Sequence, residues 1–136
     1  MTINNPNDLR RILQEARVIA VVGYSDKPHR TSYRIGRYLR EAGYKVYPVN
    51  PSVAEIDGVR SYASLAEVPV PIDIVNVFRR SEFLAEVVEQ AIDVGAKAVW
   101  AQLGVVDELA AKKAEEAGLS MVMDRCIMVD HGQLVR

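Results

Sequence analysis

The sequence contains very little cysteine: Cys126 is the single one among 136 residues. One cysteine excludes an intrachain disulfide framework and agrees with a reducing compartment. The sequence also lacks an apolar run long enough to cross a bilayer, and its first residues lack the apolar core of a signal peptide. We therefore expect a cytoplasmic protein that does not enter a membrane.

An excess of charge of either sign is also missing. The chain has 17 basic and 18 acidic residues, for a formal net charge of -1. This balance argues against a nucleic-acid or membrane-surface partner. Hydrophobic residues make up 49% of the chain and charged residues 26%, which is typical of a globular protein with a real core. No repeat or linker divides the sequence, so we predict one domain over residues 1–136.

Short apolar runs alternate with helical patterns along the chain. The run Val18–Val22 is apolar at every position, as in a strand of a parallel sheet that helices cover on both faces. The expected strands are residues 18–22, 45–49, 72–78, 97–101 and 121–123. Helical stripes separate most of them, and residues 52–71 are less regular, with a turn expected at 55–58. This order predicts an α/β fold: a doubly wound Rossmann-like domain with a five-stranded, mainly parallel sheet.

The loop after the first predicted strand is rich in groups that bind anions. It begins at Gly23 and leads directly into a helix that we expect to start near Ser32. Its hydroxyl and basic side chains are Ser25, Lys27, Arg30, Thr31 and Ser32. Free N–H groups and the helix dipole favour an anion at such a helix start, so we predict phosphate binding there. The alternative is that Thr31 or Ser32 only caps the helix and that the basic side chains are solvated.

A dinucleotide site would need further features that the sequence does not have. The G-x-G-x-x-G pattern is missing, because the glycine after Gly23 is Gly36. The second predicted strand is followed by Asn50, where a NAD site has an acidic residue for the ribose hydroxyls. An NADP-binding oxidoreductase stays open as an alternative, because Lys27 and Arg30 could meet its extra phosphate.

Four segments carry a resemblance to a known family: residues 21–33, 43–51, 100–104 and 124–126. Together they resemble the stand-alone coenzyme A (CoA)-binding proteins of bacteria and archaea, whose fold is similar to the N-terminal CoA-binding domain of the succinyl-CoA synthetase alpha subunit. The resemblance covers almost the whole chain and keeps the motifs in order. It implies CoA as the ligand, whereas the loop alone indicates only a phosphate-bearing one. Our leading hypothesis is a binding module that holds CoA or an acyl-CoA.

The resemblance also implies where CoA lies. The first loop would surround the phosphates, Asn50 and Pro51 would line the nucleotide pocket, and Gln102 would lie further along the groove. Phe78 and Arg79 would border the adenine or the start of the pantetheine arm. The expected CoA-binding residues are Gly23, Ser25, Lys27, Arg30, Ser32, Asn50, Pro51, Phe78, Arg79 and Gln102.

No catalytic or metal-binding constellation is recognisable in the sequence. In the synthetase, the phosphorylated histidine comes from a further domain and the nucleotide site from a beta subunit. We expect His29 to contact phosphate or solvent, and His131 to be exposed near a polar C-terminus. The chain is thus predicted to be a non-catalytic binding or regulatory module, with its oligomeric state open. The alternative is CoA-linked thiol or persulfide chemistry at Cys126, although a structural thiol at the start of a terminal helix is commoner.

Overall fold

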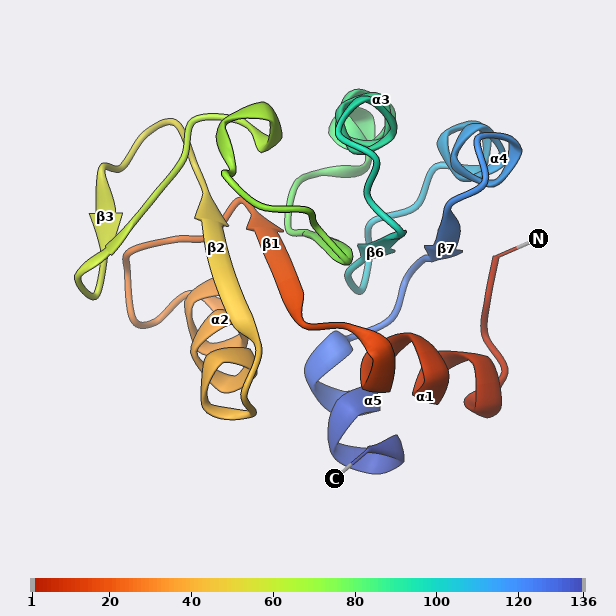
Figure 1. The fold of residues 1–136 in the computed structure, drawn as a ribbon, viewed down its shortest axis with the longest axis horizontal. Coiled ribbons are helices and arrows are strands. Elements are labelled where there is room, and N and C mark those ends of the chain that lie inside the picture. Colours follow the sequence, from red (N-terminus) through yellow and green to blue (C-terminus); the bar gives the residue numbers. More distant parts are fainter. Residues whose placement is uncertain (1, 136) are drawn as a thin grey trace.

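A computed structural model describes residues 2–135 and contains the predicted parallel sheet (Figure 1). Its spatial order is β2-β1-β5-β6-β7, and every neighbouring pair is parallel. The strands are β1 (Val18–Val22), β2 (Lys45–Val49), β5 (Ile74–Val77), β6 (Ala98–Ala101) and β7 (Ser120–Val122). The chain winds outward from β1 in both directions, so the predicted doubly wound fold is confirmed.

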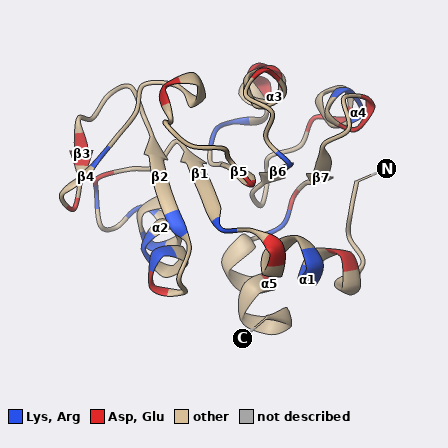
Figure 2. Cartoon of the chain, viewed as in Figure 1, with Lys and Arg blue, Asp and Glu red and all other residues tan. Residues whose placement is uncertain are grey.

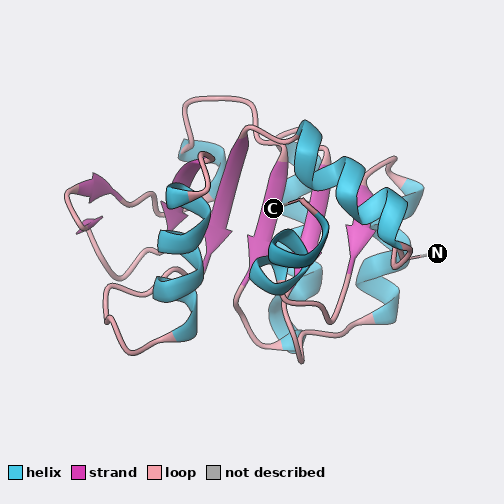
Figure 3. Ribbon diagram, turned by 90° about the horizontal axis from the view of Figure 1, so that it is seen from below, coloured by secondary structure: helices cyan, strands magenta, loops and turns pink. Residues whose placement is uncertain are grey.

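Helices cover both faces of the sheet. One face carries α1 (Pro6–Glu15), α2 (Thr31–Glu41) and α5 (Ile127–Leu134), which lie in front of the sheet in Figure 3. The other face carries α3 (Leu84–Asp93) and α4 (Glu108–Glu116), drawn above the sheet in Figure 1. Successive side chains of β1 pack into the hydrophobic cores on opposite faces of the sheet. Ile19 and Val21 lie on the first face, and Ala20 and Val22 lie on the second. This double burial explains why the strand is apolar throughout.

Local signals fix where two of the helices begin. The Asn5 side chain accepts a hydrogen bond from the Asp8 N–H at 2.9 Å and so caps α1. The Asp107 carboxylate accepts from the N–H groups of Leu109 and Ala110, both at 3.1 Å, and caps α4. Side-chain acceptors at these positions satisfy N–H groups that have no partner within the helix.

The segment between β2 and β5 contains a hairpin that the sequence did not predict beyond its turn. Strands β3 (Glu55–Ile56) and β4 (Val59–Arg60) pair antiparallel, and a short 3₁₀ helix, η1 (Leu65–Glu67), follows. The turn residues Asp57 and Gly58 have φ values of 52° and 79°, as a tight hairpin turn requires. Tyr33 donates a hydrogen bond to Asp57 at 2.6 Å and thereby ties the hairpin to α2.

The expectation that His131 is exposed is wrong. Its side chain is buried and its Nδ1 lies 2.9 Å from the Tyr38 hydroxyl, with the rings of Tyr38 and Tyr44 packed edge-on against it. The reason is that α5 packs against α1 and α2, so polar residues in its second turn face the core. None of the helices within residues 2–135 has the length and apolar character needed to span a bilayer.

Candidate ligand-binding site

The turn after β1 brings the ends of three strands together. Gly23 has a φ of +88°, and its N–H donates to the Val49 carbonyl at the end of β2 at 2.9 Å. A Cβ on Gly23 would lie only 2.7 Å from the carbonyl oxygen of Phe78, which follows β5. Both the backbone conformation and the close approach therefore require glycine.

The loop from Tyr24 to Arg30 is anchored at both of its ends. The Tyr24 side chain is buried against Gly36 of α2, where a Cβ would come within 2.3 Å of its ring. Burial raises the pKa of Tyr24 above the usual tyrosine value. The Ser25 N–H donates to the buried Ser32 hydroxyl at 3.0 Å, which joins the start of the loop to the start of α2.

Positive charge faces solvent at this helix start (Figure 2). Lys27, His29 and Arg30 are exposed, and within residues 2–135 neither Lys27 nor Arg30 makes an ion pair. Arg30 is the N-cap residue of α2, and its side chain makes no capping hydrogen bond. The N–H groups of the first helical turn are thus left for a ligand, and together with the helix dipole they favour an anion.

A polar cleft of about 440 Å³ opens at this point, and we call it the first cleft. Its lining residues are Gly23, Ser25, His29, Arg30, Thr31, Ser32, Asn50 and Phe78. Asn50 holds two of the surrounding loops, because its Nδ2 donates to the Tyr24 carbonyl and its Oδ1 accepts from the Ser52 N–H, both at 2.9 Å. The cleft is therefore preformed by the backbone.

A second cleft of about 360 Å³ shares Gly23 and Asn50 with the first. It extends between the end of β2 and α3, and its lining residues are Val22, Gly23, Val49, Asn50, Pro51, Ser52, Ala63, Arg79, Glu86 and Gln90. The Arg79 guanidinium lies 4.1 Å from the centre of the Phe83 ring, a cation–π contact that fixes its direction. The two clefts form a continuous groove at the carboxyl ends of β1, β2 and β5.

The structure brings most of the predicted CoA-binding residues to this groove. Only Lys27 and Gln102 do not line either cleft. Lys27 is exposed in the loop, next to the first cleft. Gln102 is buried, and its Oε1 accepts from the Asn76 side chain at 3.1 Å and from the Ile127 N–H at 3.0 Å.

Sequence reasoning missed the contribution of α3 to the second cleft. Glu86 and Gln90 are four residues apart and therefore share one face of the helix. The sequence contained a signal for this contribution: the helix that follows β5 has a clear apolar stripe, and both residues lie on its opposite, polar side. Asn76, fully buried in β5, was also missed; it donates to the Trp100 carbonyl at 3.1 Å and to Gln102.

Cys126 is half-buried at the N-cap position of α5, so it lies at the start of the terminal helix. It borders a cavity of about 230 Å³ beyond β6 and β7, which we call the third cavity. The neighbouring Arg125 is bound to Asp130 by two hydrogen bonds of 2.7 and 2.9 Å. Its positive charge is therefore engaged by a carboxylate.

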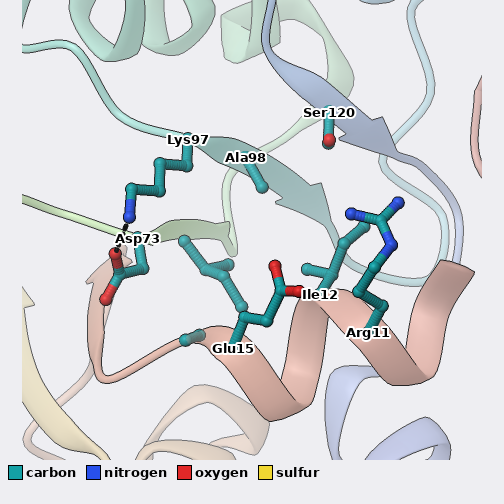
Figure 4. A pocket seen from close by; sticks show the side chains of 9 residues that line it. Arg11, Ile12, Glu15, Asp73, Lys97, Ala98 and Ser120 are labelled. Atoms are coloured by element: carbon teal, nitrogen blue, oxygen red, sulfur yellow. Dashed lines mark ion pairs between the residues drawn. The ribbon is translucent and has the colours of Figure 1, made fainter.

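The opposite edge of the sheet has a smaller cavity of about 160 Å³ (Figure 4). Its charged groups are largely satisfied within the fold. Asp73 accepts hydrogen bonds from the N–H groups of Arg17 and Val18 at 2.8 and 2.9 Å, and it pairs with Lys97 at 3.4 Å. Burial opposes the ionisation of Asp73, but these interactions outweigh it, so the pKa of Asp73 lies below its usual value.

Comparisons with known proteins agree with this geometry. A family model described as a CoA binding domain matches residues 17–132. The uncharacterized protein YneT of Bacillus subtilis is 46% identical over 131 residues, which cover 95% of this chain and 97% of that protein. The alpha subunit of an ADP-forming acetate–CoA ligase of Pyrococcus furiosus is 34% identical over 84 residues, which cover 61% of this chain but only 18% of the ligase subunit.

Solved structures share the whole fold. A hypothetical protein from Pyrococcus horikoshii superimposes with a TM-score of 0.95 at 42% identity, and the match covers 100% of this chain and 97% of that one. A dinucleotide-forming acetyl-coenzyme A synthetase of Ca. Korarchaeum cryptofilum matches with a TM-score of 0.71 at 28% identity, over 85% of this chain and 27% of the synthetase. The resemblance identified in the sequence is confirmed: the chain belongs to the CoA-binding domain family.

Proposed function

We propose that this chain binds CoA or an acyl-CoA as a binding or regulatory module without catalytic activity, and that the phosphates occupy the first cleft. The observation that carries the proposal is the start of α2, which has no side-chain cap and faces a polar cleft beside the unpaired cations Lys27 and Arg30. CoA carries a 3′-phosphate as well as a pyrophosphate. A ligand of that charge explains why cations and free N–H groups gather here.

The nucleotide of CoA then occupies the second cleft. Pro51, Ser52 and Arg79 of the second cleft supply a surface next to the phosphates. Asn50 suits a structural role between the clefts, because both polar atoms of its side chain already make hydrogen bonds. Its neutral amide stands where a NAD site has a carboxylate for the ribose hydroxyls, which favours CoA over NAD.

The proposal of a module without catalysis rests on the residues around the groove. His29 and three hydroxyl side chains line the first cleft, but within residues 2–135 no hydrogen bond joins the imidazole to a hydroxyl, as an activated nucleophile would require. The same residues offer no cluster of three side chains of the types that hold metal ions. In the ligase relatives, the matching segment is a small part of a longer chain. We accordingly expect the protein to hold CoA for a partner or to respond to it, in the cytoplasm.

Isothermal titration tests the proposal directly. We expect CoA to bind with micromolar or tighter affinity, about -8 kcal/mol or better. NAD and NADP, titrated at the same salt concentration, should show no heat of binding. Binding of NADP alone would overturn the proposal and favour the oxidoreductase alternative. A CoA-dependent thiol or persulfide turnover that disappears in Cys126→Ser would overturn the non-catalytic part.

A further inference from the structure

A few large apolar side chains are exposed on the surface, and two of them line one cavity. Within residues 2–135 they are Leu103, Val106, Leu109 and Val129, and all follow the carboxyl ends of β6 and β7. Leu103 is 65% exposed and Val129 47% exposed. Isolated exposed apolar residues are ordinary, but a group of them at a ligand-binding edge indicates a binding surface.

Leu103 and Val129 form walls of the third cavity, together with Cys126. The charged residues around it are already engaged. Arg125 and Asp130 neutralise each other, and the Asp124 carboxylate accepts from the Gly104 N–H at 2.7 Å. Its one cation, Arg125, already has a carboxylate partner, so an uncharged apolar occupant fits this lining better than an anionic one.

The loop that carries Leu103 is held in place from two sides. Asp124 binds Gly104 from the end of β7, and it does so from a left-handed conformation with a φ of 61°. On the other side, the Ser81 hydroxyl donates to the Gly104 carbonyl at 3.2 Å and accepts from the Val106 N–H at 2.8 Å. The apolar side chains are therefore presented by a fixed loop, and the cavity is preformed.

The third cavity lies at the distance that the pantetheine arm spans. Neighbouring strands are about 4.8 Å apart, so two to three spacings separate the end of β1 from the space between β6 and β7, or about 10–14 Å. The arm from the pyrophosphate oxygen to the sulfur has about twelve bonds, as many as four extended residues, and reaches about 14 Å. With the phosphates in the first cleft, an arm laid along this edge of the sheet ends at Leu103 and Cys126.

We propose that the third cavity holds the acyl group of a CoA thioester, an inference that rests on the proposed CoA site. The physiological ligands are then acyl-CoAs with an apolar, monocarboxylic acyl chain. Free CoA would leave the apolar walls in water. A dicarboxylic acyl group such as succinyl would place a carboxylate against aliphatic side chains with no unpaired cation near it. The preferred ligand therefore has a plain hydrocarbon chain.

Titration of the purified protein with CoA, hexanoyl-CoA and succinyl-CoA tests this inference. Each buried methylene contributes at most about a fourfold gain in affinity, so in this open cavity we expect hexanoyl-CoA to bind about tenfold more tightly than CoA. Succinyl-CoA should bind no more tightly than CoA. The double variant Leu103→Ser/Val129→Ser should lose most of the hexanoyl preference, measured as the ratio of the hexanoyl-CoA and CoA affinities of that same variant.

Leu109→Ser is the matched control, because Leu109 is 81% exposed on α4 and does not line the cavity. It should keep the hexanoyl preference. As a second measurement, hexanoyl-CoA should slow the reaction of Cys126 with a thiol reagent severalfold more than desulfo-CoA does, because neither of these two ligands has a thiol that consumes the reagent.

Equal binding of all three ligands would overturn the acyl inference and leave the proposed CoA site standing, whereas failure of all three to bind would overturn both. If Leu103→Ser/Val129→Ser changes the oligomeric state in sedimentation and leaves the hexanoyl preference intact, the apolar surface is an interface between copies of the chain and the inference is wrong.

Discussion

The two edges of the sheet use charged residues in opposite ways. At the amino edge, Asp73 is bound by two backbone N–H groups and by Lys97, so its charge stabilises the fold (Figure 4). At the carboxyl edge, Lys27 and Arg30 are exposed, and within residues 2–135 they have no carboxylate partner. A charge that is paired within the fold contributes to stability, whereas an exposed charge without a partner contributes little and is available to bind an anion.

Replacing a glycine at each edge is expected to give the largest difference between the two edges in stability and in CoA binding. Gly23→Ala at the carboxyl edge places a side chain at positive φ and 2.7 Å from a backbone oxygen. We expect a loss of about 3 kcal/mol in the free energy of unfolding, measured with urea, because left-handed strain and a steric overlap add up. CoA binding should also be lost, since the turn shapes both clefts.

The matched control is Gly43→Ala, between α2 and β2 at the amino edge. Gly43 also has a positive φ, 107°, but a Cβ there would meet nothing within 4 Å. We expect a loss of only about 1–2 kcal/mol and unchanged CoA affinity. Equal effects of the two variants on CoA binding would contradict the functional difference between the edges.

Asp73→Asn tests the structural role of the amino edge. The neutral amide keeps one acceptor oxygen but loses the charge that binds two N–H groups and Lys97. We expect the free energy of unfolding at pH 7 to fall by about 2 kcal/mol, the usual size for charged hydrogen bonds. CoA titrated into the folded variant should bind as in the wild type, and a weakened affinity would show that the two edges are coupled.

Removing the free cations tests the carboxyl edge. We expect Lys27→Ala/Arg30→Ala to weaken CoA binding about tenfold, because charge-assisted contacts to phosphate are lost, and to flatten the dependence of affinity on salt. Thermal unfolding should be unchanged, since neither side chain takes part in an ion pair within the described residues. Arg11→Ala/Lys112→Ala removes the same charge away from the groove and should leave the affinity unchanged. An unaltered CoA affinity in the first variant would place the phosphates elsewhere.

Much of this architecture was readable from the sequence. Each predicted strand is present, because a continuous apolar run such as Val18–Val22 encodes burial locally. The anion-binding character of the loop from Gly23 to Ser32 was also predictable from local sequence, because its glycine, hydroxyls and cations lie close together along the chain. The turn at 55–58 was predicted, but its strands of two residues each are too short to show a period.

The partners of side chains across the fold could not be read in this way. Gln102 turns its oxygen inward to Asn76 and the start of α5, and His131 is buried against Tyr38. These contacts join residues 24 or more positions apart, and they depend on how the helices pack on the sheet. Local patterns carry no information about such distances.

The smallest expected effect is a difference in acid sensitivity. The pKa of Asp73 is lowered in the folded protein, so its contribution to stability is present above the ordinary carboxyl value of about 3.9 and is lost as the pH falls through the lower folded value. The stability difference between the wild type and Asp73→Asn should hence be constant from pH 7 to about 5 and shrink below about 4. Urea titrations across this range measure this stability difference.

Asp93→Asn, at the exposed end of α3, is the control, and its free energy of unfolding should change with pH in parallel with that of the wild type. If the difference for Asp73→Asn persists undiminished in acid, the lost hydrogen-bond geometry explains the effect and the charge does not. The contrast between the two edges would then rest on hydrogen bonding and not on charge.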